Sequence, residues 1–252
     1  TTARRRAEPV AERDLAGELE LLASSQVTVV TPGGRVPVPA PVADELLAAV
    51  RSCLDNVRAH VGMDAPAWVL LEACEDRVVV SDGGHFIAWA NMYWPVAAPD
   101  RMIMIGTAYQ AIGQGFPSVA GAARAKPDST VVLTTGDGGG LMALADLETA
   151  VRVAGGRGLA VVWNDRAYGA EIHLYGRKGF AREPMLIDEV DFAGLARAVG
   201  AEGVVVRTLD DLVALAEWTR RPVAERPFLL LDLRISGEVM APYQREVIRV
   251  NA

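Results

Sequence analysis

The sequence contains only two cysteines, Cys53 and Cys74, and their spacing is not that of a metal-binding motif. Both lie among apolar residues, so we interpret them as buried thiols of a reducing compartment, with a disulfide as the alternative. No apolar run is long enough to span a bilayer, and no basic segment followed by a hydrophobic one marks a secretory signal. These absences argue against a secreted or membrane-embedded protein, and the cytoplasm is the expected location.

Basic charge is also scarce. The formal net charge is −7, and no basic stripe with interleaved aromatic residues is present, which argues against a dedicated nucleic-acid-binding protein. About half of the 252 residues are apolar and about a quarter are charged, as in a globular protein able to bury a large core in one or two domains. The chain starts at Thr1 rather than Met, as expected for a processed, cleaved or expressed piece of something longer.

The stretch from Thr130 to Gly169 has the pattern of a β-α-β unit. A short β-branched run over residues 130–135 predicts a buried strand, and a second apolar run over residues 158–163 predicts another. Between them, apolar residues recur at helical spacing and end at two glycines (Leu141, Leu144, Leu147, Val151, Ala154, then Gly155 and Gly156). A right-handed crossover makes the strands parallel, so Asp137 and Asn164 are expected at the same carboxyl edge, where open α/β sheets bind ligands.

The residues at that edge indicate a site for a phosphorylated ligand and a metal ion. Glycines in the run Gly136–Gly140 allow the backbone to approach a bulky anion, and the start of the following helix offers N–H groups and a positive dipole end. A carboxylate from Asp137 and an amide oxygen from Asn164 are hard oxygen ligands of the kind that Mg²⁺ prefers together with phosphates. The alternative is that Asp137-Gly138 forms only a tight turn.

The sequence Gly136-Asp137-Gly138, followed about 25 residues later by Asn164, resembles the thiamine-diphosphate (ThDP) binding motif of ThDP-dependent enzymes. The segments ADLETAVR and NDRAYG are similar to those of the acetolactate synthase and 2-oxoacid decarboxylase branch. The resemblance runs from roughly Val78 to Leu233 and covers the diphosphate-binding domain of that family. The chain departs from the usual pattern in having Asp165, where a second Asn is common.

The resemblance implies roles for particular residues. It implies that Mg²⁺ is held by Asp137, Asn164 and the backbone carbonyl of Arg166. It implies that the large aliphatic Ile112 bends the cofactor, while the carbonyl of Gln110 meets its amino group. The remaining cofactor-binding residues implied are Gly83, Gly84 and His85 in a loop after a strand, then Gly136, Gly138, Gly139, Ala167 and Tyr168.

Several of these positions have simpler explanations. The loop at Gly83–His85 could be a plain strand-to-helix turn, and Ile112 could be an ordinary core residue. The aromatic cluster Trp89–Trp94 is better explained by core or interface packing than by substrate binding. Polar residues after NDRAYG either determine substrate specificity, as the equivalent segment does in relatives, or are solvated surface residues (Glu171, His173, Arg177, Lys178).

The predicted fold is a three-layer α/β/α domain with a mostly parallel sheet, as in the ThDP-binding fold. We expect this domain to span residues 41–252, with residues 1–40 as the tail of a preceding domain or a linker arm. Its other predicted helices cover residues 43–61, 68–74 and 191–200, and one starts at Thr208 with a capping box to Asp211. Its other predicted strands cover residues 77–80, 204–206 and 228–233.

The resemblance implies a ThDP- and Mg²⁺-dependent enzyme that cleaves and forms C–C bonds on a 2-oxoacid, as acetolactate synthase does in pyruvate decarboxylation and carboligation. The alternatives are another ThDP lyase, such as a single- or two-subunit 2-oxoacid decarboxylase, or a non-catalytic ThDP-binding subunit. In the family, a catalytic Glu comes from a separate pyrimidine-binding domain, and no segment of this sequence resembles that domain. We therefore expect a pyrimidine-binding domain or subunit as partner, and a homodimer or homotetramer.

Overall fold

The structure is a computed structural model, and it describes residues 11–22, 35–44, 47, 74, 76–87, 99–105, 111–239 and 248–250. The helices predicted over 43–61 and 68–74 lie largely outside these residues, and Cys53, the Trp89–Trp94 cluster and Gln110 lie outside them entirely. The chain divides into two compact units, residues 1–65 and 66–252. The predicted division into a tail over 1–40 and a domain over 41–252 stays a prediction.

The first unit contains a small antiparallel ribbon. Strand β1 (Glu12–Asp14) pairs with β2 (Pro37–Pro39), and helix α1 (Leu15–Glu20) follows β1 directly. Asp14 ties the ribbon together, because its carboxylate accepts the backbone N–H of Val36 at 3.0 Å. Across the described segments of both units, no helix has the length and apolar character needed to cross a membrane.

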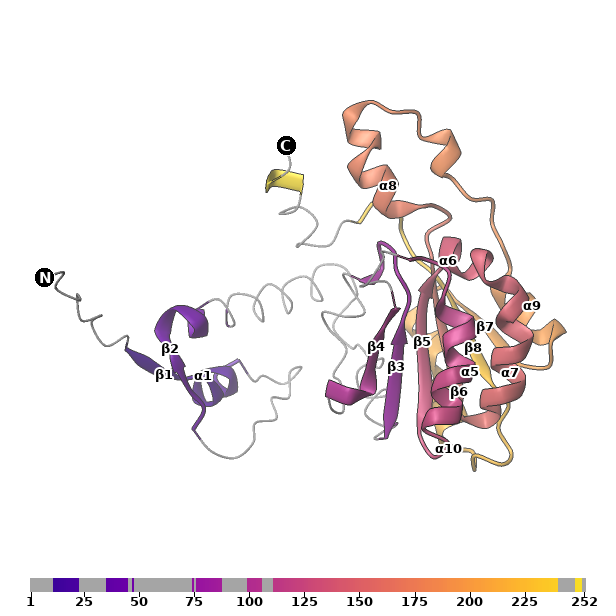
Figure 1. Cartoon of the computed structure of the whole chain (residues 1–252), viewed down its shortest axis with the longest axis horizontal. Helices are drawn as coiled ribbons and strands as arrows, with labels where there is room; N and C mark the ends of the chain where they lie inside the picture. Colours follow the sequence, from indigo (N-terminus) through magenta and orange to yellow (C-terminus); the bar gives the residue numbers. More distant parts are fainter. Residues whose placement is uncertain are drawn as a thin grey trace, which may run out of the picture. The chain divides into compact units, whose positions relative to one another are not determined.

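The second unit is built on a six-stranded sheet in the order β4-β3-β5-β6-β8-β7, with every neighbouring pair parallel (Figure 1). The strands are β3 (Arg77–Ser81), β4 (Met102–Met104), β5 (Thr130–Gly136), β6 (Gly158–Asn164), β7 (Glu202–Val206) and β8 (Leu229–Arg234). The strands predicted from apolar runs are therefore present, and the mostly parallel sheet is confirmed.

Helices cover both faces of this sheet. On one face, Phe116, Leu147 and Phe192 pack on β-strand residues such as Leu133. These side chains come from α5 (Gly115–Ala125), α7 (Leu147–Ala154) and α9 (Phe192–Ala198). On the other face, Trp218 of α10 (Val213–Arg220) packs with residues that alternate with the first set. Because successive strand residues point to opposite faces, continuous apolar strands need this three-layer arrangement, which was the predicted fold.

The crossover between β5 and β6 places the functional loops. The helix predicted from Leu141 begins already at Asp137, as α6 (Asp137–Met142), and a 3₁₀ turn (Leu144–Asp146) separates it from α7. Three consecutive glycines in α6 weaken a continuous helix, which accounts for the interruption. Gly136 pairs with Trp163 in the sheet, so the residues that follow each of them emerge at the same edge.

The remaining short elements surround that edge or close the domain. Helix α8 (Gly169–Leu174) follows β6, and 3₁₀ turns cover Gly176–Lys178 and Glu183–Met185. Further 3₁₀ turns lie at Pro99–Arg101, Gly155–Arg157 and Leu209–Leu212. The predicted capping box between Thr208 and Asp211 is confirmed.

Candidate functional site

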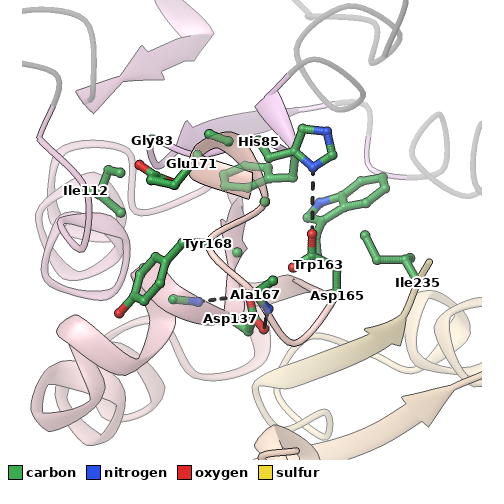
Figure 2. A pocket seen from close by; sticks show the side chains of 17 residues that line it. Gly83, His85, Ile112, Asp137, Trp163, Asp165, Ala167, Tyr168, Glu171 and Ile235 are labelled. Carbon is green, nitrogen blue, oxygen red and sulfur yellow. Dashed lines mark hydrogen bonds and ion pairs between the residues drawn. The ribbon is translucent and has the colours of Figure 1, made fainter. Parts of the chain in front are cut away.

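A pocket opens at the carboxyl edge of the sheet, between the loops that follow β3, β5, β6 and β8 (Figure 2). Ten of the residues predicted for the site line it: Gly83, Gly84, His85, Ile112, Gly136, Asp137, Gly138, Gly139, Ala167 and Tyr168. It is also lined by residues to which no role was assigned, namely Phe86, Trp163, Asp165, Gly169, Ala170 and Ile235, and by Glu171. Asn164 and Arg166 are not among the lining residues.

Asp137 is the first residue of α6 and is 2% exposed. Its Oδ1 accepts the N–H of Gly138 at 2.9 Å, and its Oδ2 accepts the N–H of Ala167 at 3.2 Å. Burial, and then the nearby negative charge of Asp165, raise the pKa of Asp137 to about 7. The carboxylates of Asp137 and Asp165 therefore both bring negative charge to this pocket.

Asp165 is the second of these carboxylates, with a side chain 6% exposed. Its Oδ2 lies 3.7 Å from Nδ1 of His85. Side chains alternate along an extended chain, so Trp163 and Asp165 both face the pocket, while Asn164 between them faces the other way. This alternation is the signal that would have identified Asp165 from sequence.

The structure does not bring Asn164 to the pocket. Its buried amide donates to Oδ1 of Asp232 at 2.9 Å and to the carbonyl of Val190 at 3.2 Å, and so links β6 to β8 and to the loop before α9. The backbone carbonyl of Arg166 is also turned away, because it accepts the N–H of Ile187 at 2.8 Å. In the structure both groups hold the loops around the pocket, and their assignment as metal ligands stays a prediction.

The glycines predicted to contact phosphates have two distinct functions. A Cβ atom at Gly138 would lie 2.6 Å from the ring of Tyr168, and one at Gly139 would lie 2.9 Å from Oδ2 of Asp82. Neither position therefore has room for a side chain. The N–H groups of Gly138 and Ala167 donate to Asp137 and orient its carboxylate. The binding of the cofactor by these two residues stays a prediction.

His85 lies beside another histidine, His173, which belongs to helix α8. The ring centroids of His85 and His173 are 4.8 Å apart, and both Nε2 atoms are buried without a hydrogen-bond partner in the described part of the chain. Burial, with smaller effects of His85 and Arg177, lowers the pKa of His173. Arg177 and Lys178 are exposed and do not line the pocket, which favours the surface interpretation of those two residues.

Residues 82–231 match the sequence model of the thiamine pyrophosphate enzyme, C-terminal TPP binding domain. The chain belongs to this family. The match covers more than half of the chain and includes the loops that line the pocket after β3 and β5, and residues 163–171 at and beyond the end of β6. Thiamine pyrophosphate is ThDP, so the predicted family and its cofactor are supported by this match.

Similar proteins of this family catalyse different reactions, as their names state. The chain is 31% identical to the sulfoacetaldehyde acetyltransferase of Castellaniella defragrans over 69% of its own length and 29% of that protein. It is 32% identical to the acetolactate synthase of Bacillus subtilis over 57% of its length and 25% of that enzyme. The TPP-binding chain thus spans about a third or less of these relatives.

A solved structure supports the fold of this TPP-binding domain. The benzoylformate decarboxylase of Polynucleobacter necessarius superimposes with a TM-score of 0.56 and 19% sequence identity. The superposition covers 68% of this chain and 33% of the decarboxylase.

Asn164 of this TPP-binding domain allows a direct test of whether it binds the metal ion or holds the loops together. Asn164→Asp would place a second carboxylate against Asp232, whose pKa burial already raises. We expect a loss of roughly 1–3 kcal/mol in the free energy of unfolding, because a buried donor is lost and a second negative charge is added beside Asp232, with which Arg234 already pairs. Urea unfolding would measure this loss, while the affinity for Mg²⁺ in the presence of ThDP stays largely unchanged. Tighter Mg²⁺ binding at unchanged stability would instead return Asn164 to the metal site.

Proposed function

We propose that this chain binds ThDP together with Mg²⁺ and supplies the diphosphate- and metal-binding half of an enzyme acting on a 2-oxoacid. The single observation that carries the proposal is that two buried carboxylates, those of Asp137 and Asp165, line one pocket inside the matched TPP-binding region and that the charge of Asp165 acts on Asp137. Carboxylate and carbonyl oxygens fit Mg²⁺, which is usually bound by one or two carboxylates and substrate phosphates. The raised pKa of Asp137 supports the same fit, since a divalent cation would relieve the repulsion.

The proposed ligands are the two carboxylates and the backbone carbonyl of Ala167. The N–H of Ala167 points at Asp137, and in an extended residue the carbonyl lies on the same side of the chain as the N–H. The neighbouring groups, the carbonyl of Arg166 and the N–H of Tyr168, pair with the segment at Met185–Ile187 on the opposite side. This leaves the Ala167 carbonyl on the pocket side.

The other lining residues would position the organic part of the cofactor. Ile112 presents an aliphatic side chain to the pocket next to Gly83 and Gly139, and Trp163 and Ile235 add apolar surface. Bound ThDP supplies a carbanion that adds to a carbonyl group and a ring that accepts the electrons released with CO₂. The chain's part in this chemistry is to hold, orient and exclude water, which is electrostatic and geometric catalysis.

We propose an acetolactate-synthase-like reaction, in which pyruvate is decarboxylated and joined to an acceptor. The similarity to acetolactate synthase and to sulfoacetaldehyde acetyltransferase supports a transferase. A different ThDP lyase, such as a 2-oxoacid decarboxylase, is the second candidate, and a non-catalytic ThDP-binding subunit is the third. We further propose a pyrimidine-binding domain or subunit as partner and a homo-oligomer, because the resemblance assigns the catalytic Glu to such a domain.

The test is pyruvate turnover with and without that partner. The chain with ThDP and Mg²⁺ is expected to consume little pyruvate alone and to consume it when a pyrimidine-binding domain is added in trans. Product analysis then separates the candidates, because a carboligation product indicates a transferase and free aldehyde indicates a decarboxylase. Cofactor binding without turnover in any combination would favour the non-catalytic subunit, and absence of cofactor binding would reject the proposal.

A further inference from the structure

Asp82, the residue directly after β3, is 2% exposed and is surrounded by hydrogen-bond donors. Its Oδ1 accepts the N–H groups of Gly83 at 2.8 Å, Gly113 at 3.0 Å and Gln114 at 3.3 Å. Its Oδ2 accepts the hydroxyl of Thr135 at 3.0 Å and also contacts the N–H of Gly113 at 3.2 Å. A buried carboxylate is costly unless it is hydrogen-bonded on both oxygens, and here both are used.

These donors come from three segments that are far apart in the sequence. Gly83 belongs to the loop after β3, Gly113 and Gln114 precede α5, and Thr135 lies in β5 just before the Gly136–Gly140 run. Each segment contributes to the wall of the pocket described above. The side chain of Asp82 therefore joins the three loops. Gly113 lies 31 residues after Asp82 in the sequence, and Thr135 lies 53 residues after it.

Ile112 is held directly by this arrangement. A Cβ atom on Gly83 would lie 3.1 Å from Cγ1 of Ile112, and one on Gly139 would lie 3.3 Å from its Cγ2, so the isoleucine sits between two glycine loops. The same hypothetical Cβ on Gly139 would lie 2.9 Å from Oδ2 of Asp82. The Asp82 carboxylate thus lies behind the wall that Ile112 presents to the pocket, and its bond to Gly113 anchors the residue next to Ile112.

We propose that Asp82 is a positioning residue that sets the place of Ile112 relative to the Gly136–Gly140 loop, and thereby the shape of the cofactor pocket. The proposal concerns the site of the proposed function, and its ligand-binding readout rests on that function. Asp82 does not line the pocket itself, so its effect on a ligand is transmitted through the backbone at Gly113 and Gln114. No role for Asp82 was predicted from the sequence.

The test compares four variants with the native chain. Asp82→Ala removes every acceptor, Asp82→Asn keeps one acceptor oxygen, and Thr135→Val removes the hydroxyl donor without changing the side-chain size. Val78→Ala is the matched control. Val78 lies in β3, the strand that ends just before Asp82, and is 1% exposed, but it does not border the pocket. Calorimetric titration with ThDP plus Mg²⁺ measures affinity, and hydrogen exchange measures the protection of the Gly113 and Gln114 amides.

Asp82→Ala is expected to weaken ThDP–Mg²⁺ binding by about 10- to 100-fold, the range for losing hydrogen bonds to a charged group. Asp82→Asn and Thr135→Val should show smaller losses of affinity. The rate of hydrogen exchange at the Gly113 and Gln114 amides should increase most in the variant that loses most affinity. Val78→Ala should lower the unfolding midpoint but leave affinity and these two amides unchanged. If Asp82→Ala does not fold, the affinities and amide protection of Asp82→Asn and Thr135→Val, compared with those of Val78→Ala, still decide the outcome.

The proposal would be overturned if Asp82→Asn and Thr135→Val bound ThDP–Mg²⁺ as tightly as Val78→Ala, with unchanged protection of Gly113 and Gln114. If the native chain bound no ThDP, the proposed function would fail by itself. The exchange measurement would then still test whether Asp82 holds the Ile112 loop.

Discussion

Asp137→Asn is expected to abolish measurable binding of ThDP with Mg²⁺, with a loss of affinity of about 100-fold or more. The substitution keeps the size of the side chain and an oxygen that can accept the N–H of Ala167 or Gly138. It removes the negative charge of Asp137, and with it one of the two carboxylates proposed to bind Mg²⁺. Calorimetric titration, together with the ligand-induced rise in unfolding temperature, measures the effect.

Glu148→Gln is the control for this experiment. Glu148 lies in the first turn of α7, its side chain is 52% exposed, and it pairs with Arg152 on the surface. Its neutralisation removes the same formal charge from the chain outside the pocket, so ThDP–Mg²⁺ binding should be unchanged. Equal losses in the two variants would mean that overall charge, and not a metal ligand, had been measured.

The same substitution is expected to make the metal-free protein more stable at pH 8. Burial, and then the charge of Asp165, raise the pKa of Asp137 from 3.8 to about 7 in the folded chain. A group with a raised pKa binds its proton more tightly when folded, so stability falls as pH rises through the interval between about 4 and 7. Above that interval the full penalty applies, roughly 4 kcal/mol as an upper estimate from the two pKa values.

Urea unfolding in a chelator at pH 5 and pH 8 measures this penalty. The free energy of unfolding of Asp137→Asn should exceed that of the native chain by more at pH 8 than at pH 5. In saturating ThDP and Mg²⁺ the order should reverse, because only the native chain gains from binding. A variant that is less stable than the native chain at pH 8 without metal would show that Asp137 is not electrostatically strained.

These two expectations describe one trade-off. In the empty pocket the buried carboxylate of Asp137 destabilises the fold, and a bound cation would offset this cost. Sites of this kind commonly reduce stability in exchange for function. The hydrogen bonds from Ala167 and Gly138 keep Asp137 in place in spite of the repulsion.

Much of the fold could be predicted because apolar periodicity reports burial. The runs over residues 130–135 and 158–163 became adjacent parallel strands, and Thr208 with Asp211 formed the expected cap. The interruption after α6 was missed, since a string of apolar residues at helical spacing continues across it. There the glycines, which allow close packing against Tyr168 and Asp82, outweigh the periodicity.

The loops that border the pocket could be predicted, and ten of the predicted site residues line it. Asn164 and Arg166 do not line it, because the direction of a group at a strand end depends on how far the extended conformation continues. Asp82 was missed because its partners at Gly113 and Thr135 are distant in sequence. Local patterns identify which loops meet, but contacts between loops decide which atoms face the pocket.

The most direct test of the metal site uses Mn²⁺ in place of Mg²⁺ and follows the phosphorus resonances of ThDP by NMR. Paramagnetic broadening by protein-bound Mn²⁺ reports a metal ion next to the diphosphate. We predict strong broadening with the native chain and with Asn164→Ala, and its loss with Asp137→Asn and with Asp165→Ala, which leaves no side-chain oxygen at that position. Broadening that survived in both aspartate variants, or that vanished in Asn164→Ala with the fold intact, would contradict the assignment of Asp137 and Asp165 as the metal-binding pair.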